Sequence, residues 1–274
     1  MKEEISFEFM KYQAYGNDFV IIDGRKFSLK SPLKISKLIS DRHFSVGCDD
    51  VLYIENSSFA AIKMRVCDPD GSESSMCGNG VRCVADYMMK ELGKSEISIE
   101  TAGGIKIVTK RGPGIYTVNM GLMQNIGDFI EPPSDETIEE RDFELGRFYI
   151  VSPGEPHAVT VVKNVDEIDI KNALAISKNK DIFPHGINVD FCQLQGEILK
   201  LRTFERGLWG ETLSCGTGAV SSVFVVHSQF KAPDELDVQT KGGILHVKIT
   251  NEGILLTGEA ISVFNGNMTL SLDE

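Results

Sequence analysis

The sequence contains the block Glu-x-x-x-Cys-Gly-x-Gly twice, and each copy places a thiol next to glycines. The first copy spans residues 73–80 and contains Cys77, and the second spans 211–218 and contains Cys215. The two cysteines lie 138 residues apart, about half the length of the chain. Each block runs directly into an apolar segment with helical spacing. Two thiols at equivalent helix starts predict one site with two matching acid/base groups.

A cysteine at the N-terminus of a helix is suited to proton transfer. Backbone N–H groups and the positive end of the helix dipole stabilise the thiolate, so we expect lowered pKa values for Cys77 and Cys215. The glycines let a ligand approach the backbone, whose N–H groups form an anion site suited to a carboxylate. If both helices face one ligand, one thiolate removes a proton from carbon and the other thiol protonates the opposite face. The result is inversion at that carbon, with the developing charge stabilised by the helix N-termini.

A wider internal repeat surrounds the two blocks. Four segments recur in the same order at offsets of 137 to 139 residues. A repeat this long indicates a duplicated domain, since the repeats of solenoid proteins span only about 20–50 residues. The segments are 16–19, 63–66, 73–80 and 101–105 in the first half, and 154–157, 200–203, 211–218 and 240–244 in the second.

The elements that must position the thiols are many short strands and few helices. Helices are predicted from Ser31-Pro32 to residue 39, over 81–92 with Gly93 as its end, around 168–176 and over 219–226. The last of these is apolar nearly all round, so we expect a small sheet to curl around it. The acidic segment 127–142, which contains Pro132-Pro133, is the predicted linker. The predicted strands are 19–22, 51–54, 60–66, 97–100, 105–109, 115–120, 148–151, 158–162, 188–193, 198–203, 244–250, 253–257 and 262–270.

Composition excludes several classes of protein. The 274 residues are 42% hydrophobic and 25% charged, which is ordinary for a globular chain. The net charge of −12 gives no general attraction to nucleic acid or to an anionic membrane. The first residues do not resemble a signal peptide, and no apolar run is long enough to span a bilayer. We therefore expect a cytoplasmic protein.

The cysteine usage indicates reduced thiols and no metal centre. Six cysteines in a chain of this length do not resemble a disulfide framework. The sequence contains no C-x-x-C pair, so it predicts no bound metal. Cys48, Cys67 and Cys192 lie in apolar contexts and are expected to be buried and inert.

The two blocks and their flanks resemble diaminopimelate epimerase. The motifs that carry the resemblance are M-C-G-N-G-V-R-C at 76–83, E-R-G-L-W-G-E-T-L-S-C-G-T-G-A at 205–219, G-N-D-F at 16–19 and G-x-P-H at 154–157. The resemblance covers nearly the whole chain and implies epimerisation of LL- to meso-diaminopimelate by a two-base mechanism without a cofactor. It also implies a cytoplasmic homodimer that acts in lysine and peptidoglycan precursor synthesis.

The resemblance implies an α+β fold of two pseudo-symmetric domains. Each domain is expected to be a barrel-like mixed sheet around a central helix, with the active site in the cleft between them. Residues 1–120 form the first expected domain and residues 121–261 the second. The last strand, 262–274, is expected to return to the first domain.

The resemblance also implies roles for individual residues, each matched through its motif. Cys77 and Cys215 match the two acid/base cysteines. His157 and Glu205 match the polar partners that tune the thiols, and the sequence leaves open which partner serves which thiol. The matching substrate-binding positions are Asn17, Asp50, Asp68, Gly78, Asn79, Glu155, Asn188, Glu205, Arg206, Gly216 and Thr217. Among them, Arg206 is expected to hold the distal carboxylate of the substrate in a forked contact.

Three positions depart from the family pattern. Family members usually carry glutamine at the position of Asp50 and asparagine at the positions of Asp68 and Glu155. An amide can donate a hydrogen bond to a substrate carboxylate, whereas an ionised carboxylate cannot. The changes are either local, with Asp68 starting its Asp-Pro-Asp-Gly turn and Glu155 pairing with a cation, or they shift specificity towards a cationic side chain. The presence of Arg206 favours diaminopimelate.

Three alternatives to diaminopimelate epimerisation stay open. The first is a cofactor-independent racemase of a basic amino acid such as lysine, ornithine or histidine. The second is an isomerase of the phenazine-pathway type, which lacks the cysteine pair and is therefore disfavoured. The third, from a different class, is a thiol redox switch or an amino-acid-binding module that uses Cys77 and Cys215 reversibly.

Overall fold

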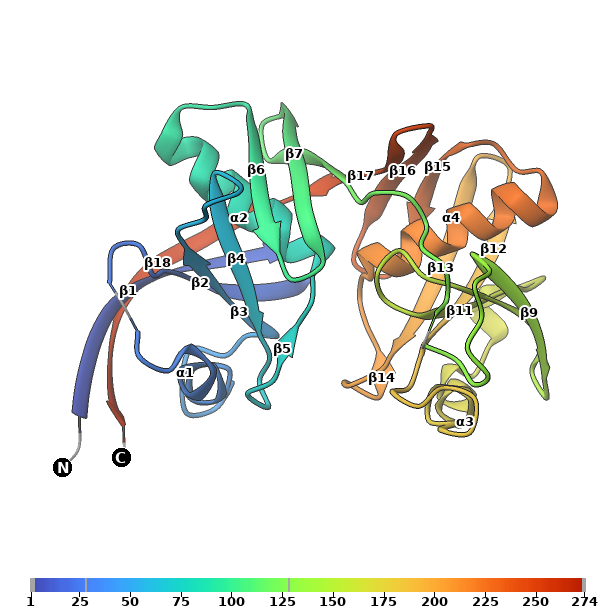
Figure 1. Cartoon of the computed structure of the whole chain (residues 1–274), viewed down its shortest axis with the longest axis horizontal. Helices are drawn as coiled ribbons and strands as arrows, with labels where there is room; N and C mark the ends of the chain where they lie inside the picture. Colours follow the sequence, from blue (N-terminus) through green and yellow to red (C-terminus); the bar gives the residue numbers. More distant parts are fainter. Residues whose placement is uncertain (1–2, 28, 128, 273–274) are drawn as a thin grey trace. The chain divides into compact units, whose positions relative to one another are not determined.

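The computed structural model describes residues 3–27, 29–127 and 129–272. Its contacts divide the chain into two compact units. The first unit contains the described residues up to Val118 together with those from Glu259 onward, and the second runs from Asn119 to Gly258. Each unit has its own strands and its own long helix (Figure 1).

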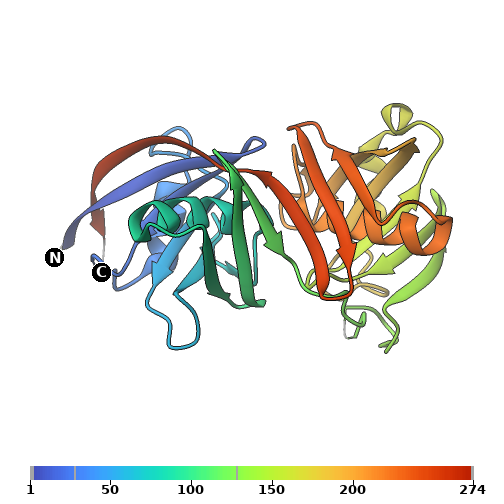
Figure 2. The same ribbon diagram turned by 90° about the horizontal axis from the view of Figure 1, so that it is seen from above.

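The first unit pairs its strands in one continuous order. Strand β18 pairs with β1, β1 with β2, β3 with β4, and β6 with β7 and then β8, all antiparallel, whereas β2–β3 and β4–β6 are parallel. The short β5 forms an antiparallel hairpin with β4. The long strands β1 and β18 lie side by side (Figure 2). The elements are β1 (Glu3–Ala14), β2 (Asn17–Asp23), α1 (Pro32–Ile39), β3 (Asp50–Glu55), β4 (Ile62–Cys67), β5 (Glu73–Ser74), α2 (Gly78–Leu92), β6 (Glu96–Thr101), β7 (Gly104–Gly112), β8 (Ile115–Asn119) and β18 (Ile261–Leu272).

The second unit follows the same order of pairings. Strands β9–β10, β10–β11, β12–β13, β15–β16 and β16–β17 are antiparallel, whereas β11–β12 and β13–β15 are parallel. The short β14 forms a hairpin with β13, as β5 does with β4. The elements are β9 (Ile138–Phe143), β10 (Gly146–Val151), β11 (His157–Val161), the 3₁₀ turns η1 (Val165–Glu167) and η2 (Ile170–Asn172), α3 (Ala173–Ser177), β12 (Asn188–Gln195), β13 (Ile198–Glu205), β14 (Gly210–Glu211), α4 (Gly216–Phe230), β15 (Glu235–Gln239), β16 (Ile244–Thr250) and β17 (Gly253–Glu259).

The long helix of each unit packs against the strands of that unit. Helix α2 contacts β1, β2, β3, β4, β6 and β7, and α4 contacts the strands at the equivalent positions, β10, β11, β12, β13, β15 and β16. Val220, Val223 and Val226 of α4 are fully buried, which confirms that most of this helix is surrounded by protein, whereas Phe224 is partly exposed and Phe230, the last residue of the helix, is 47% exposed. Helix α2 ends at Gly93 in the left-handed conformation, as predicted from the sequence.

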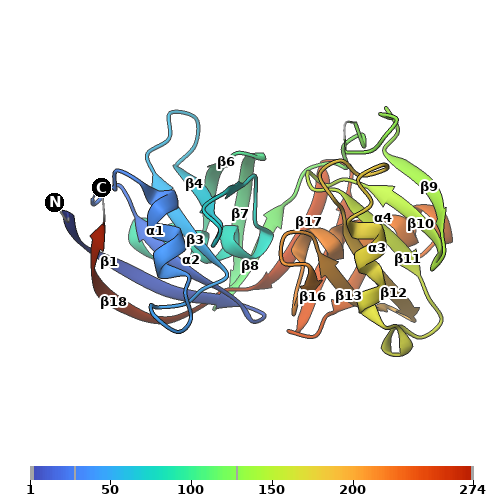
Figure 3. The ribbon, with the colours of Figure 1, turned by 90° about the horizontal axis from the view of Figure 1, so that it is seen from below.

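One prediction about the second half was wrong, and another was right only in part. The acidic segment 127–142 is not a linker, because Ile130 packs in the core of the second unit and residues 138–143 form β9, paired with β10. Its exposed acidic side chains Glu140 and Asp142 lie on one face of this strand, so they do not indicate an unstructured connection. The helix predicted around 168–176 is shorter, since two 3₁₀ turns precede α3, which contacts β12 and β13 (Figure 3).

Candidate active site

Cys77 is the N-cap residue of α2. Its backbone is extended, and its Sγ accepts a hydrogen bond from the backbone N–H of Gly80 at 3.3 Å. The short strand β5 ends three residues before Cys77, so the cysteine closes the loop that leads from the hairpin into the helix. The capping bond points the thiol along the helix axis, towards the end where backbone N–H groups emerge.

The amide of Asn17 faces the Cys77 thiol. Its Oδ1 accepts from Cys77 Sγ at 3.8 Å and from Asn79 Nδ2 at 3.2 Å. Its Nδ2 donates to the carboxylate of Asp49 at 2.9 Å, which fixes the orientation of the amide. The sequence analysis missed Asp49, although it directly precedes Asp50, because its partner lies 32 residues away in the chain.

A fully buried arginine holds the first turn of α2. Arg82 donates to Asn79 Oδ1 at 2.6 Å, to the Gly78 carbonyl at 3.1 Å and to the Glu259 carbonyl at 3.2 Å. Burial lowers the pKa of this guanidinium, and the three bonds compensate for lost hydration. Arg82 thereby turns the Asn79 amide so that its Nδ2 meets Asn17.

Cys215 occupies the equivalent place in the second unit. It is the N-cap of α4, and its Sγ accepts from the Gly218 N–H at 3.4 Å. Its side chain also lies 3.4 Å from Thr217 Oγ1. Only 8% of the residue is exposed. Both cysteines therefore cap their helices in the same way, as the two sequence blocks predict.

A buried histidine connects to Cys215 through a hydroxyl group. His157 Nε2 lies 3.0 Å from Thr217 Oγ1, and Nδ1 lies 2.6 Å from the carboxylate of Asp190. Asn188, which is opposite His157 in the parallel β11–β12 pair, donates its amide to Nε2 at 3.3 Å. A carboxylate only accepts, so Nδ1 carries the proton and Nε2 accepts. The chain of contacts runs from Cys215 through Thr217 and His157 to Asp190.

Asp190 is a residue that sequence reasoning missed. It is fully buried, and its second carboxylate oxygen accepts from the Thr203 hydroxyl at 2.6 Å. A carboxylate orienting an imidazole is a common arrangement in proton-transfer sites. Its position two residues after Asn188 puts both side chains on the same face of β12, which is the only signal in the sequence.

The expected lowering of the Cys215 pKa is wrong for this structure. Burial raises the pKa of the thiol well above 9.0, and the negative charges of Glu205 and Asp190 raise it further. The bonds from Thr217 and from the Gly218 N–H act in the opposite direction but do not compensate. Ionisation of a thiol that is only 8% exposed carries a large desolvation penalty. The favourable electrostatics of the helix N-terminus therefore do not by themselves give a thiolate at rest.

Glu155 and Arg206 form an ion pair in the second unit. Arg206 Nη2 bonds the Glu155 carboxylate, and both side chains are about one-quarter exposed or less. The Arg206 backbone N–H donates to Asn188 Oδ1 at 2.9 Å, which links the turn after β13 to the His157 cluster. Glu155 therefore pairs with a cation, as one of the two interpretations of this position predicts. The cation is Arg206, the residue expected to hold the distal carboxylate of the substrate.

Asp68 and Asp50, the other two positions that depart from the family pattern, both lie in the first unit. Asp68 accepts from the hydroxyls of Ser72 at 2.8 Å and Ser74 at 3.0 Å, so it caps its own turn. Asp50 begins β3 opposite Phe19 and is half-buried. The first unit thus holds Asn17, Asp50, Asp68, Cys77, Gly78 and Asn79, and the second holds Glu155, His157, Asn188, Glu205, Arg206, Cys215, Gly216 and Thr217.

The other four cysteines are buried thiols. Cys48, Cys67 and Cys192 are at most 3% exposed, as expected, and Cys83 is fully buried. Burial raises the pKa of Cys48 to about 11 and the pKa values of Cys67 and Cys83 to about 12.

Among the described residues, no helix is long and apolar enough to cross a membrane. Nor do the residues described here bring three or more His, Cys, Asp or Glu side chains together in a way that could hold a metal ion.

Comparison with known sequences identifies relatives along the whole chain. The family model for diaminopimelate epimerase matches residues 9–126 and 149–263. The chain is 35% identical over 271 residues to the diaminopimelate epimerase of Archaeoglobus fulgidus, and the match covers 96% of each protein. It is 36% identical over 266 residues to the diaminopimelate epimerase of Methanothrix thermoacetophila, covering 94% of this chain and 95% of that protein.

Solved structures show the same fold in more distant proteins. A hydroxyproline epimerase from Agrobacterium vitis superposes with a TM-score of 0.70 at 14% identity, covering 97% of this chain and 92% of that one. A phenazine biosynthesis protein of the PhzF family from Bacillus anthracis gives 0.69 at 19% identity, covering 96% and 99%. These similarities establish a mixed α+β fold made mostly of strands.

Proposed function

The chain belongs to the diaminopimelate epimerase family, and we propose that it interconverts LL- and meso-diaminopimelate without a cofactor. In the proposed reaction, the thiolate of one cysteine removes the α-proton and the thiol of the other protonates the opposite face. Protons balance because one thiol is regenerated as the other ionises. The proposed product serves lysine and peptidoglycan precursor synthesis.

The observation that carries this proposal is the matched capping of two helices by Cys77 and Cys215. Each Sγ accepts from the N–H three residues ahead, at 3.3 Å and 3.4 Å. Equivalent thiols suit a reaction that must run in both directions with equivalent groups on the two faces of one carbon. We propose that the helix starts at Gly78-Asn79 and Gly216-Thr217 bind the α-carboxylate and stabilise the charge of the carbanion.

The environment of each thiol supports an assignment of the tuning residues. We propose that His157 and Glu205 both act on Cys215, since Thr217 connects the imidazole to the thiol and the Glu205 charge raises the thiol pKa. A raised pKa suits Cys215 to the role of acid in the resting enzyme. Asn17 is the polar partner of Cys77.

The mechanism has consequences for the whole molecule that are also proposals. A single ligand must meet both thiols, so the expected cleft between two pseudo-symmetric domains follows from this requirement. The shared order of strand pairings supports an origin of the two domains by duplication. A homodimer in the cytoplasm is proposed from the family resemblance alone.

Deuterium incorporation tests the mechanism directly. Incubation of LL-diaminopimelate with the enzyme in deuterated water should place deuterium at the α-carbon, with no pyridoxal phosphate added. Cys77→Ser and Cys215→Ser should each reduce epimerisation by at least about a hundredfold, because serine is a far weaker acid at neutral pH. A requirement for pyridoxal phosphate, or full activity of either variant, would contradict the two-thiol mechanism.

Comparison of substrates separates the proposal from a basic amino-acid racemase. The kcat/KM values for diaminopimelate, lysine, ornithine and histidine should be highest for diaminopimelate, since Arg206 offers a forked contact to a distal carboxylate. A preference for lysine or ornithine would identify the alternative.

Oxidation of the protein separates the proposal from a redox switch. Oxidation should abolish turnover of an epimerase, because a disulfide between Cys77 and Cys215 removes both proton carriers.

A further inference from the structure

Several residues of the internal repeat have no part in the proposed chemistry. They form contacts with the loops that precede the two cysteines. In the first unit, Arg65 of β4 forms a forked pair with Glu73, the first residue of the block, with bonds of 2.9 and 2.7 Å. Glu73 lies opposite Cys67 in the β4–β5 hairpin, so Arg65 meets it on the diagonal. The Gly103 N–H donates to the carbonyl of Ser75 at 2.8 Å.

The second unit repeats these contacts at the equivalent residues. Arg202 of β13 forms a forked pair with Glu211, with bonds of 2.6 and 3.0 Å. The Gly242 N–H donates to the carbonyl of Leu213 at 2.7 Å. In both units the acid lies four residues before the cysteine and the carbonyl lies two residues before it. The repeat therefore conserves within this chain a set of contacts and not only a sequence pattern.

We propose that these contacts act as a brace that positions each reactive thiol, with Arg65, Glu73 and Gly103 positioning Cys77. The equivalent brace for Cys215 consists of Arg202, Glu211 and Gly242. The proposal rests on the proposed function, since it assigns the braced thiols to proton transfer. These residues touch neither thiol and act through the backbone that precedes it.

The geometry shows why a brace is needed on this side of each cysteine. The helix that follows holds the cysteine from its C-terminal side through the N-cap bond. The preceding loop has no regular structure between β5 and α2, or between β14 and α4, so its position depends on contacts from neighbouring strands. A forked ion pair fixes both distance and angle, which a single hydrogen bond does not. A Cβ at Gly103 would meet Met76 Cβ at 3.2 Å, a tight contact that favours glycine at this close approach.

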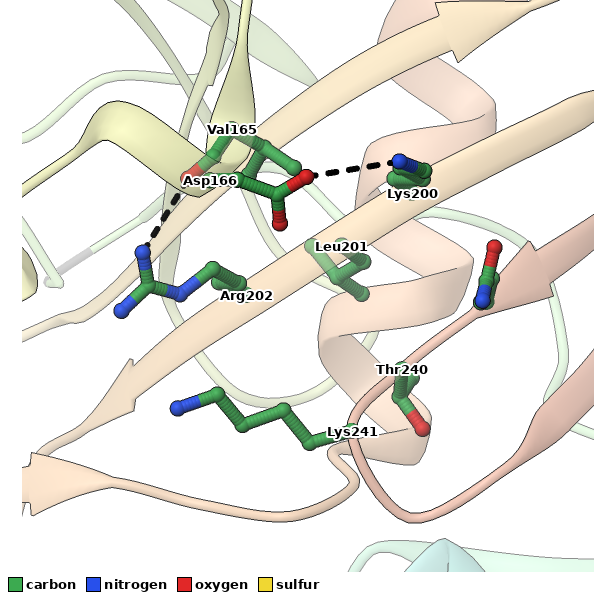
Figure 4. A pocket seen from close by; sticks show the side chains of 8 residues that line it. Val165, Asp166, Lys200, Leu201, Arg202, Thr240 and Lys241 are labelled. Carbon is green, nitrogen blue, oxygen red and sulfur yellow. Dashed lines mark hydrogen bonds and ion pairs between the residues drawn. The ribbon is translucent and has the colours of Figure 1, made fainter.

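The brace of Cys215 has additional contacts. Lys241 donates to Glu211 at 2.6 Å, whereas Ala102 stands at the equivalent position of the first unit. Arg202 also donates to the carbonyls of Val165 at 3.1 Å and Ile168 at 2.8 Å. Figure 4 shows Arg202 reaching the Val165 carbonyl at the wall of an open pocket that Lys241 also lines. Glu211 thus receives two cations and Arg202 donates to two further carbonyls, whereas among the described residues Arg65 has one further partner, Glu55 at 3.4 Å.

Alkylation of the individual thiols tests the proposal. Glu73→Gln and Glu211→Gln are treated with iodoacetamide, and the rates at Cys77 and Cys215 are measured separately by mass spectrometry. Glu73→Gln should change the rate at Cys77 by about fivefold or more and leave Cys215 unchanged, and Glu211→Gln should do the reverse. Because displacement of a reacting group by about 1 Å can cost about a hundredfold, kcat should fall roughly 10- to 100-fold while KM stays within about threefold.

Matched controls come from the same repeat. Lys63→Ala and Lys200→Ala remove a cation two residues before each arginine, from the same strand face. In the described structure Lys63 pairs with Glu55 and Lys200 with Asp166, not with the block acids. The charge of Lys63 still lowers the pKa of Glu73, so this control separates an effect of charge at a distance from the effect of the forked contact. These variants should keep wild-type alkylation rates and kcat. Double variants should show that each pair acts as a unit: Arg65→Gln with Glu73→Gln should be no worse than either single change.

Each remaining outcome decides the question. Wild-type rates in Glu73→Gln and Glu211→Gln, or equal changes at both thiols in either variant, would overturn the brace. If Glu211→Gln does not fold, Lys241→Ala provides the test, since loss of this half-exposed side chain should leave the fold stable. It should change the alkylation rate at Cys215 alone, and an unchanged rate counts against the proposal. Alkylation does not depend on turnover, so site-specific changes in a protein that fails to epimerise diaminopimelate would uphold the brace and reject the proposed function.

Discussion

At the scale of single residues, the protonation of Cys215 is set by burial rather than by the helix that it caps. Two favourable bonds, from Thr217 and Gly218, lower its pKa, but desolvation and the charges of Glu205 and Asp190 raise it more. The acid form of this thiol is therefore the resting form at neutral pH. This protonation state supports the role of acid proposed for Cys215.

The raised pKa predicts the pH dependence of Cys215 alkylation. A raised pKa means less thiolate than in free cysteine at any pH below it, so the rate should stay low at neutral pH and still be rising above pH 9.0. Glu205→Gln should shift the profile to lower pH because it removes a negative charge, and Thr217→Val should shift it to higher pH because it removes a stabilising bond. Alkylation of Cys215 followed by mass spectrometry from about pH 6 to about pH 10 measures both shifts. Shifts of the reverse sign would show that these groups act differently.

A second single-residue property is the ion pair between Glu155 and Arg206. If a substrate carboxylate binds Arg206, it must displace or share the bond that Glu155 now makes. The same carboxylate attracts a substrate ammonium group, so one residue affects the two candidate substrate classes in opposite directions.

Glu155→Gln should therefore raise selectivity for diaminopimelate over lysine. We expect KM for diaminopimelate to fall roughly fivefold with kcat little changed, since removing a partly exposed charge is worth about 1 kcal/mol or less. Any kcat/KM for lysine should fall. Steady-state kinetics on both substrates measure the ratio. An increase in KM for diaminopimelate would indicate that Glu155 orients Arg206 for the substrate and does not compete with it.

At the scale of elements, the second glycine of each block has a different surrounding. A Cβ at Gly218 would lie 2.6 Å from Asp190 Oδ1 and 2.9 Å from Thr203 Oγ1. Both groups are buried: Asp190 bonds His157, and Thr203 donates to Asp190. At Gly80, the atoms nearest to an added Cβ are the methyl groups of Leu52, at 3.0 Å and 3.1 Å, followed by Cys77 Cβ at 3.4 Å. The two helices begin alike in sequence, but the second glycine of the block faces the polar pair Asp190–Thr203 in α4 and the apolar side chain of Leu52 in α2.

Alanine substitutions at these glycines should have unequal effects. Gly218→Ala should destabilise the protein by about 1–3 kcal/mol, because overpacking displaces Asp190 and Thr203, and should also reduce kcat through His157. Gly80→Ala should cost little, since the Leu52 side chain can move and alanine favours helix by up to about 1 kcal/mol. Urea unfolding of both variants measures the difference. Equal destabilisation would mean that the requirement for glycine comes from the helix start itself.

At the scale of the whole molecule, the two units share one order of strand pairings, and β18 completes the pattern in the first. Strand β18 stands beside β1 where β9 stands beside β10. The strand pair β1–β18 joins residues near the two ends of the sequence, such as Phe9 and Gly266. A contact of this separation closes only after the whole chain is available, and such long-range pairings slow folding.

The sequence by itself determined the features that depend on neighbouring residues. The helix starts at Cys77 and Cys215, the glycine end of α2 and most strands follow from local spacing and capping, and the structure confirms them. The repeated segments predicted equivalent surroundings for the thiols. The linker prediction for the segment 127–142 was wrong because an acidic composition indicates only that side chains are exposed. It does not show whether the segment pairs with another strand.

Only the tertiary structure decided which distant groups meet. Asp49 beside Asn17, Asp190 beside His157 and Glu155 on Arg206 join residues 32, 33 and 51 positions apart, respectively. The pKa of Cys215 also depends on tertiary burial, which outweighs the local effect of the helix start. Hydrogen bonds and desolvation act over a few ångströms in space, whereas sequence patterns report on neighbours along the chain. The helix starts that carry the two cysteines could therefore be predicted from the sequence, whereas the protonation of Cys215 and the distant partners of both thiols could not.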